Sequence, residues 1–553
     1  MLGRRIGEPG NLKGTDYIAR EFRRLRLTPA GDNGTYFQVL PYGPGGFDST
    51  SALFTANGSP IGPTRDWIPL APSVTTGVGV RADITNVPTV FAGRWGDTAV
   101  VLDRVRFAGK IAVFTGTPAS VGIAPPRVAP IVRCDSVPDK FGASAAALVE
   151  AAVRDSTARA GGTAATGARR TQGTPDPRAR RAGAVGILVI VLDSLPRATT
   201  SIAFATRMAM QPDSLTSSSD MSGAAISGAT ALRLFGRRAS ELAIGTAGQP
   251  VSERWNYEWH ISKTPGRNVI ALMPGSDPAR AAEYVLVGAH NDHNGVNTTA
   301  VDHDSLRAVN TVTRRQGSND PVCRPTEAQR QRIDSLIARA RRIRPARRDS
   351  IMNGADDDGS GTTLLLELAE RFASERPARS IIFVSHEGEE SGLLGSKWFT
   401  DHPTVPLASI VAAHNMDMEG KGRVDQVRFG GPTSVQTLGA RRLSRDFGDI
   451  IDSVNATRAE TMAIDKSWDV AANPMNRFCR SDQVNYVNHD IPVTYFSTGY
   501  SPDYHQPTDE PQYIDYEHAA RVGRFVHDIM MAVANRKDRP KITGADPTYP
   551  MCR

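Results

Sequence analysis

The chain has 553 residues and a mass of 59.5 kDa, enough for about two to four domains with sizeable cores, which excludes a small disulfide-stapled fold. Hydrophobic residues make up 40% and charged residues 22% of the sequence, as in ordinary globular proteins, and the mean hydropathy is -0.31. No stretch approaches the roughly 18 consecutive apolar residues of a membrane-spanning helix, so we expect no membrane span.

The net charge of +7 is concentrated in one window of the sequence. Between positions 321 and 350, nine arginines stand against three acidic residues. Outside this window the charges nearly balance, which argues against a nucleic-acid-binding protein and indicates a local basic feature.

The first predicted element in chain order is an amphipathic helix over 11–27. Its apolar residues recur at helical spacing; they are Tyr17, Ile18, Phe22 and Leu25. The residues before it lack the apolar core of a signal peptide. We therefore expect either a cytoplasmic protein or, by preference, an exported one (periplasmic or extracellular) whose start lies upstream of Met1.

The next region, 85–245, reads as a separate β-rich domain. Short β-like runs at 98–102, 110–114 and 185–190 lie among Gly, Pro and Thr residues. Within this region, the Gly-, Ala-, Thr- and Arg-rich stretch 154–181 has too little apolar content to pack, and we expect a long surface loop there.

From about residue 250 to 537 the pattern is that of an α/β domain. Apolar strands alternate with helical segments; the predicted strands are 284–288, 381–384, 410–413 and 492–496, and the predicted helices are 360–375 and 513–533. Runs that are apolar on both faces indicate a mixed, mostly parallel sheet flanked by helices. Residues 538–553 are expected to form a tail.

The four cysteines lie far apart in the sequence and form no C-x-x-C pair; they are Cys134, Cys323, Cys479 and Cys552. This spacing gives no support for a zinc ribbon or a dithiol redox motif. Free thiols and long-range disulfides both remain open.

Clusters of metal-ligating residue types follow the predicted strands. They are His290-Asn-Asp292, His386-Glu-Gly-Glu-Glu390, His414-Asn-Met-Asp417 and Asp503-Tyr-His505, and a fifth cluster, Asp356-Asp357-Asp358, precedes the helix over 360–375. Ligands bind at the carboxyl ends of strands in open α/β sheets, so these clusters can converge. Each alone is more often a surface turn or a helix cap, but two histidines and three carboxylates together suit a pair of divalent ions.

Other hydrolase and nucleotide motifs are not supported. His386-Glu387 is not followed by the second histidine of H-E-x-x-H, and it follows a strand instead of lying on a helix. Neither G-x-S-x-G nor G-x-x-x-x-G-K-[ST] occurs in the sequence.

The set of motifs resembles peptidase family M28, the co-catalytic zinc peptidases. In the family's order, they are His290-x-Asp292, Gly354-Ala-Asp-Asp-Asp-Gly-Ser-Gly361, Glu389-Glu390-Ser-Gly-Leu-Leu-Gly-Ser396, Asn415-Met-Asp417 and Tyr504-His505-x-Pro507-x-Asp509. The resemblance covers roughly 255–535. Residues 85–245 are similar to the protease-associated (PA) domain that many members carry as an insertion, so residues 1–84 are expected to contribute to the peptidase domain.

The resemblance implies two zinc ions and a role for each matching residue. His290 and Asp417 bind one zinc ion, Glu390 and His505 bind the other, and Asp357 bridges them. Glu389 is the general base, Asp292 orients His290, and Tyr504 donates a hydrogen bond to the oxyanion. Asp356 and Asp358 remain alternatives for the bridge, while the family's motif does not require His293, His303 or His386.

The sequence departs from the family pattern in an insertion over 296–352. A helix is predicted within it from the spacing of Ile333, Leu336, Ile337 and Ala340. One hypothesis is a lid in which Arg341 and Arg342 favour acidic peptides; the other is a solvated helical decoration. Gln483 stands where the family often has histidine, so substrate preference is not carried over.

We therefore expect a di-zinc exopeptidase acting on peptide substrates, and specifically an aminopeptidase. A glutamate-type carboxypeptidase, a glutaminyl cyclase and a receptor-like binding module without catalysis are the alternatives. No nucleic-acid partner is expected.

Overall fold

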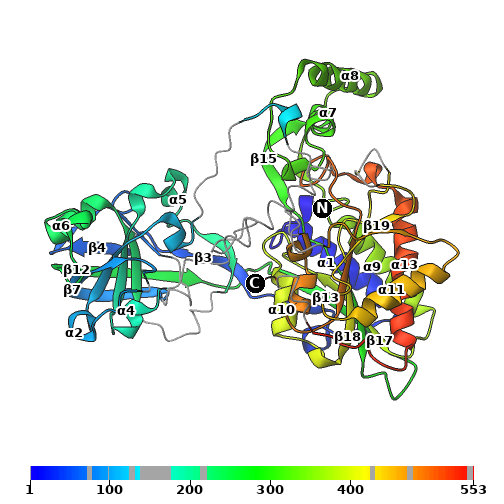
Figure 1. The fold of residues 1–553 in the computed structure, drawn as a ribbon, viewed down its shortest axis with the longest axis horizontal. Helices are drawn as coiled ribbons and strands as arrows, with labels where there is room; N and C mark the ends of the chain where they lie inside the picture. The colour runs from blue at the N-terminus through cyan, green and yellow to red at the C-terminus, as the bar shows by residue number, and fades with distance from the viewer. Residues whose placement is uncertain are drawn as a thin grey trace. The chain divides into compact units, whose positions relative to one another are not determined.

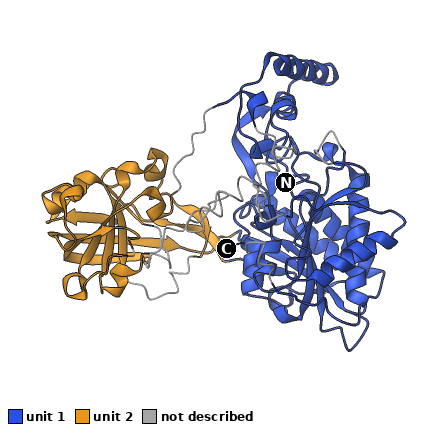
Figure 2. Cartoon of the chain, in the orientation of Figure 1, with its two compact units in different colours: residues 1–40, 130–166, 264–553 blue, residues 41–129, 167–263 orange. Residues whose placement is uncertain are grey.

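A computed structural model describes residues 2–70, 78–97, 99–123, 131–137, 176–211, 221–423, 427, 430–469, 477–544 and 552. The chain divides into two compact units (Figure 2). Unit 1 comprises Met1–Leu40, Pro130–Thr166 and Thr264–Arg553, and unit 2 comprises Pro41–Ala129 and Gly167–Lys263. This division differs from the expected boundaries, because 41–84 falls in unit 2.

Unit 1 is built on a nine-stranded mixed sheet within the described residues (Figure 1). Its strands, in spatial order, are β1 (Thr28–Pro29), β13 (Arg267–Met273), β17 (Ser380–His386), β14 (Tyr284–His290), β18 (Ile410–Met416), β21 (Val493–Ser497), β19 (Ser434–Leu438) and β20 (Ala463–Asp465), with β2 (Phe37–Val39) also paired to β13. The four central strands, β17, β14, β18 and β21, are parallel to their neighbours within that group. This confirms the predicted α/β class and its four strands.

Alternate residues of the central strands enter two separate cores. In β14, Val285 and Val287 pack with one set of helices, whereas Leu286 packs on the opposite face. The first face is covered by α1 (Pro9–Arg24), α9 (Gly359–Ala373), α11 (Arg445–Thr457) and α13 (Tyr516–Asn535), and the second by α10 (Leu394–Asp401) and α12 (Gln483–Val487). This double coverage explains why the strands read as continuous apolar runs.

The N-terminal helix α1 confirms the predicted element, with one correction. Ile18 and Phe22 are buried in the first core, as the spacing predicts. Tyr17 is 41% exposed, because its position lies off the buried stripe of the helix, and Arg20 stacks on its ring.

The insertion forms a small substructure of unit 1. It comprises β15 (Gly295–Asp302), α7 (His303–Thr313), α8 (Glu327–Ile343) and β16 (Arg348–Met352), and β15 pairs antiparallel with β16. Helix α8 begins at a capping box formed by Thr326 and Gln329, and Ile333 is its buried residue. The disulfide Cys134–Cys323 joins this insertion to the segment 131–137, where the Arg324 amide donates to the Val132 carbonyl at 2.8 Å.

Unit 2 is built on a ten-stranded sheet within the described residues. Its strands are β3 (Tyr42–Phe47), β4 (Leu53–Ala56), β5 (Ser59–Pro60), β6 (Trp67–Pro69), β7 (Arg81–Arg94), β8 (Ile111–Thr115), β9 (Gly186–Ile190), β10 (Arg207–Met210), β11 (Ser222–Ile226) and β12 (Ala247–Trp259). Its helices are α2 (Arg104–Phe107), α4 (Arg178–Arg181), α5 (Arg197–Ser201) and α6 (Gly228–Phe235). The predicted β-rich character is therefore present in this unit.

Individual predictions for unit 2 had mixed outcomes. The runs at 110–114 and 185–190 form β8 and β9. The run at 98–102 contains no strand among its described residues, 99–102, and Val101 is 90% exposed there, so this apolar residue does not pack in a core. Most of the predicted loop over 154–181, namely 154–175, lies outside the described residues. The end of the predicted loop forms α4.

All four cysteines are paired in long-range disulfides, Cys134–Cys323 and Cys479–Cys552. The first closes a sequence separation of 189 residues and the second one of 73. The sequence left free thiols and long-range disulfides open, and the structure contains disulfides. Among the described helices, none is both long and apolar enough to cross a membrane.

Candidate metal centre

Two groups of metal-ligating side chains meet in unit 1 beyond the carboxyl ends of β14, β17 and β18. One group is His290, Asp357 and Asp417, and the other is His293, Asp357, Glu390 and His505. Within each group, the candidate ligand atoms all lie within 4.8 Å of one another. The structure thus brings together all five predicted metal ligands, and it adds His293.

Asp357 belongs to both groups and presents one carboxylate oxygen to each. Its Oδ1 lies 3.3 Å from His290 Nε2, and its Oδ2 lies 2.9 Å from His505 Nε2. His505 Nε2 is also 3.1 Å from Glu390 Oε2, whereas His290 Nε2 is 4.0 Å from Asp417 Oδ1. A carboxylate placed between two such groups has the arrangement that a bridging ligand needs.

The donor atoms fit divalent cations of the zinc type. In the described part of the chain, five buried atoms of the two groups have no hydrogen-bond partner; they are His290 Nε2, His293 Nδ1, His293 Nε2, Asp417 Oδ1 and Glu390 Oε1. An unsatisfied buried polar atom is costly, and imidazole and carboxylate donors are the ligands that zinc takes. Burial also raises the pKa of Asp417 to about 6, an effect that a bound cation would reverse.

The carboxylates next to Asp357 hold the surrounding loops and do not join either group. Asp358 Oδ1 accepts from the amides of Gly361 at 2.9 Å and Met418 at 3.1 Å, and its Oδ2 accepts from the His290 amide at 3.2 Å. Asp356 Oδ1 accepts from the Gly420 amide at 2.7 Å. Of the three consecutive aspartates, Asp357 is therefore the one that belongs to both groups.

Asp509 supports the loop that carries Asp357. Its carboxylate accepts from the amides of Asp356 and Asp357, with Oδ2 at 3.0 and 3.1 Å from the two nitrogens. Lys421 Nζ lies 3.6 Å from Asp509 Oδ1, and both side chains are buried. The sequence motif contains Asp509, but its spacing gave no indication of this supporting role.

Arg4 is a further supporting residue that sequence reasoning missed. Its guanidinium donates to the main-chain carbonyls of Asn291 at 2.7 Å, Asn353 at 2.6 Å and Gly354 at 2.9 Å. The first carbonyl belongs to the loop after His290 and the other two to the loop before Asp357. Arg4 therefore clamps together two loops that carry candidate ligands.

Glu389 and Asp292 face the group that contains His290. Glu389 Oε2 lies 3.9 Å from His290 Nε2, and the Glu389 amide donates to Asp292 Oδ1 at 3.0 Å. The Asp292 carboxylate is 3.6 Å from His290 Nδ1, while the Asp292 main-chain oxygen is nearer, at 3.1 Å. Burial raises the pKa of Glu389 well above its ordinary value, and the neighbouring Asp417 adds to this shift.

Tyr504 stacks on His505, with ring centroids 4.0 Å apart. Its hydroxyl accepts a hydrogen bond from Arg480 at 3.2 Å. Burial raises the pKa of Tyr504 well above its ordinary value, so the hydroxyl keeps its proton and remains a hydrogen-bond donor.

Two other histidines, His386 at the end of β17 and His303 at the start of α7, have other partners. His386 Nε2 lies 2.8 Å from the Tyr486 hydroxyl, and burial lowers the pKa of His386 to about 3. His303 Nε2 pairs with Glu510 at 2.8 Å. Neither belongs to the two groups.

The arginines proposed for a lid differ in their surroundings. Arg341 donates to Asp304 Oδ2 at 3.0 Å and also pairs with Asp302, so its charge is neutralised within the insertion. Arg342 is exposed on α8. The pairing of Arg341 gives no support to recognition of acidic peptides by this side chain.

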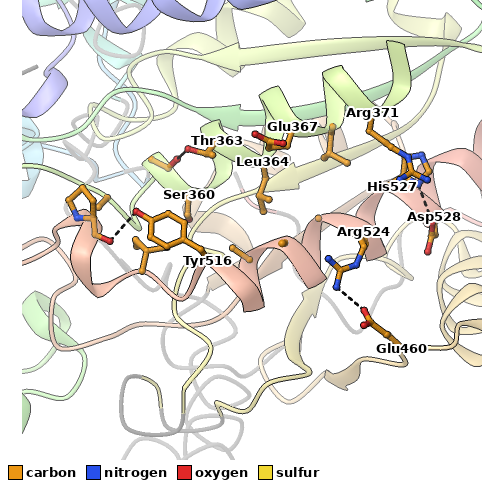
Figure 3. A pocket seen from close by; sticks show the side chains of 18 of the residues that line it. Ser360, Thr363, Leu364, Glu367, Arg371, Glu460, Tyr516, Arg524, His527 and Asp528 are labelled. Atoms are coloured by element: carbon orange, nitrogen blue, oxygen red, sulfur yellow. Dashed lines mark hydrogen bonds and ion pairs between the residues drawn. The ribbon is translucent and has the colours of Figure 1, made fainter. Parts of the chain in front are cut away.

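A cavity of about 950 Å³ lies apart from these groups, between α9 and α13 (Figure 3). Its walls carry Ser360 and Leu364 of α9 and Tyr516 and Arg524 of α13, and Arg524 pairs with Glu460 at 2.8 Å. None of the predicted metal ligands or catalytic residues is among the described residues that line it. The candidate centre is therefore defined by converging side chains and not by this cavity.

Comparison with known proteins gives a family match for most of unit 1. Residues 268–530 match the model of "Peptidase family M28". A probable zinc metalloprotease of Pyrenophora teres f. teres is 26% identical over 215 residues, which cover 35% of this chain and 43% of that protein. Aminopeptidase YwaD of Bacillus subtilis is 26% identical over 195 residues, which cover 34% of this chain and 39% of that protein. The matched segments thus span less than half the length of these curated relatives.

Solved structures of low sequence identity also align with the chain. An aminopeptidase from Aneurinibacillus sp. strain AM-1 is 15% identical, with a TM-score of 0.39, over 99% of this chain and 93% of that chain. BSAP, a zinc aminopeptidase from Bacillus subtilis, is 16% identical, with a TM-score of 0.39, over 99% and 94% of the two chains.

Proposed function

Because residues 268–530 match the model of peptidase family M28, we propose that this chain is a di-zinc aminopeptidase that removes amino-terminal residues from peptides. The observation that carries the proposal is the position of Asp357, whose two carboxylate oxygens face two separate groups of ligand side chains. The names of the relatives, which include zinc metalloproteases and an aminopeptidase, support the same class of reaction.

The five predicted ligands divide between two zinc ions. His290 and Asp417 would hold one ion, Glu390 and His505 the other, and Asp357 both. Bound in this way, the ions would lower the pKa of water and polarise the scissile carbonyl group.

The protein's own residues supply the proton transfer. Glu389 lies beside His290 without belonging to either ligand group, so its carboxylate is free to take the proton of the attacking water and deliver it to the leaving amine. Asp292 fixes the main chain of Glu389 and lies against the His290 ring. Tyr504 keeps its hydroxyl proton and would donate it in a hydrogen bond to the oxyanion.

The experiment uses a pool of peptides with free or acetylated amino termini, incubated with the zinc-loaded protein and analysed by mass spectrometry. We expect loss of single amino-terminal residues from the free peptides alone, and no cleavage with a chelator. Trimming from the carboxyl end would instead indicate a carboxypeptidase, and loss of ammonia from amino-terminal Gln a cyclase. Intact peptides in every sample, with no zinc bound, would exclude the proposal.

Substitution of the base separates catalysis from metal binding. Glu389→Gln should lower kcat by about 10²- to 10⁴-fold while two zinc ions stay bound. Glu517→Gln is the control, because the Glu517 side chain is 85% exposed on α13. Equal activities of the two variants would exclude Glu389 as the base.

We also propose an exported protein with a PA-like second unit. Two long-range disulfides are typical of proteins from oxidising compartments. The sequence resemblance of the β-rich region supports the assignment of unit 2 as a PA-like module.

A further inference from the structure

His293 lies in the second group of the candidate centre, although the family's motif does not require a histidine at this position. The residue is 1% exposed, and its ring is 5.5 Å from the ring of His505, measured between centroids. Its ring supplies a candidate ligand atom together with Asp357, Glu390 and His505. The position therefore places a third imidazole at the centre.

The contact between His293 and Glu390 is not a hydrogen bond, although the two side chains lie close together. His293 Nδ1 lies 2.6 Å from Glu390 Oε1. Within the described residues, these two atoms nevertheless lack a partner with hydrogen-bond geometry, and His293 Nε2 lacks one as well. Two potential metal-ligand atoms that lie this close together without a hydrogen bond between them have the arrangement of ligands that converge on one cation.

The backbone fixes His293 in this position. Its amide donates to the Arg4 carbonyl at 3.2 Å, and Arg4 also holds the loop before Asp357. Gly354 leaves the room for the imidazole, because a Cβ atom there would lie 2.5 Å from His293 Cγ. The side chain is thus held against the centre by the same residues that position the bridging loop.

We propose that His293 is a further protein ligand of the zinc ion that Glu390 and His505 hold. This inference rests on the proposed di-zinc function. The two ions then differ: four protein side chains hold one ion, and three hold the ion beside His290. A four-ligand site is closed and retains its metal, whereas a three-ligand site keeps a position for water or substrate. Chemistry is therefore centred on the ion next to Glu389, and the other ion binds more tightly.

The test counts imidazole ligands directly. The full chain is labelled with ¹⁵N-histidine, loaded with ¹¹³Cd²⁺, and examined by NMR for one-bond coupling between nitrogen and cadmium. Three coupled imidazoles are expected in the wild type and two in His293→Ala. His386→Ala is the matched control, since it also removes a buried imidazole near the sheet edge, and it should keep three.

A chelator titration of the zinc-loaded protein gives a second readout. The wild type should release its two ions at different chelator concentrations, and His293→Ala should weaken the tighter site by more than about tenfold. The number of imidazoles coupled to cadmium in the wild type tests the inference even if the variant does not fold. Two bound ions with only two coupled imidazoles would overturn this inference alone; a wild type that binds no metal would overturn the proposed function and this inference with it.

Discussion

Arg307 of α7 forms an ion pair with Asp503, with 3.2 Å between Arg307 Nε and Asp503 Oδ1. Asp503 is 2% exposed and stands two positions before His505. The Arg307 guanidinium also lies over the Tyr513 ring, 3.9 Å from its centroid. The insertion is thereby attached to the loop that carries a candidate metal ligand.

Removal of this ion pair should loosen the His505 loop. In Arg307→Met, Lys421 remains as a charged partner of the buried Asp503 carboxylate, with its Nζ 3.5 Å away. The substitution should lower the unfolding free energy by about 1–3 kcal/mol. We expect weaker zinc binding as well, measured by chelator competition. Arg330→Met is the control, because Arg330 is 52% exposed on α8, and an equal effect of both variants would show that the ion pair with Asp503 has no special role.

The parts of this fold that the sequence predicts are those with a strong apolar pattern. The four central strands and α9, α8 and α13 have continuous or periodic apolar residues, and the clusters after the strands follow from strand direction alone. The start of unit 2 was missed because the sequence of β3, Tyr-Gly-Pro-Gly-Gly-Phe, contains three glycines and one proline and has no alternation of apolar and polar residues.

The missed site residues have long-range partners that local sequence does not encode. Arg4 contacts carbonyl groups nearly 350 positions away in the chain, at a distance that no periodicity reveals. His293 lies in the irregular segment between β14 and β15, where neither a helical nor a strand period indicates the direction of the side chain. Asp358 and Asp357 are neighbours of the same type, and only the folded loop separates their roles.

Gly354 should be essential for the geometry of the centre. Its φ is +55°, and a Cβ atom would lie 2.2 Å from the Asp357 carbonyl oxygen. Gly354→Ala should therefore displace the bridging loop and lower both zinc content and kcat/KM by at least about tenfold. Gly34→Ala is the matched control, since Gly34 has a φ of +74° and open space around the added methyl group. If Gly354→Ala binds as much zinc as Gly34→Ala, the added methyl group does not displace the bridging loop and the prediction is wrong.

Zinc should stabilise unit 1 selectively. The buried carboxylates of the centre lose mutual repulsion when a cation binds, and binding to the folded state alone adds about 2.7 kcal/mol at a zinc concentration 100 times Kd. Hydrogen exchange identifies which calorimetric transition of the full chain belongs to unit 1. Chelation of zinc should lower the unfolding temperature of that transition. An equal shift in unit 2, which contains none of these ligands, would contradict a site confined to unit 1.

The disulfide between Cys134 and Cys323 should stabilise the insertion. It closes a separation of 189 residues, and its removal by paired Ser substitutions should cost about 2–5 kcal/mol. Hydrogen exchange in α8 should rise in this variant. Paired Ser substitutions at Cys479 and Cys552 are the control, because that disulfide lies outside the insertion. If hydrogen exchange in α8 does not change when Cys134 and Cys323 are replaced, the disulfide does not stabilise the insertion.

The stability of unit 2 should fall with rising pH through Glu253 of β12. Burial raises the pKa of Glu253 from 4.5 to about 8, although Ser222 lowers it in part. Between about pH 4.5 and 8, the folded state keeps a proton that the unfolded state has lost, so the unfolding free energy decreases by up to about 1.4 kcal/mol per pH unit. Below this window, the proton is bound in both states and the contribution disappears.

Glu253→Gln should remove this dependence. The variant should match the wild type near pH 4 and exceed its stability by several kcal/mol at pH 8, because the neutral amide carries no charge to bury. Urea unfolding at several pH values, with hydrogen exchange in β12 as the local readout, measures the difference. Glu258→Gln, an exposed change on the same strand, should retain the wild-type slope. A slope in Glu253→Gln equal to that of the wild type would assign the pH dependence to other groups.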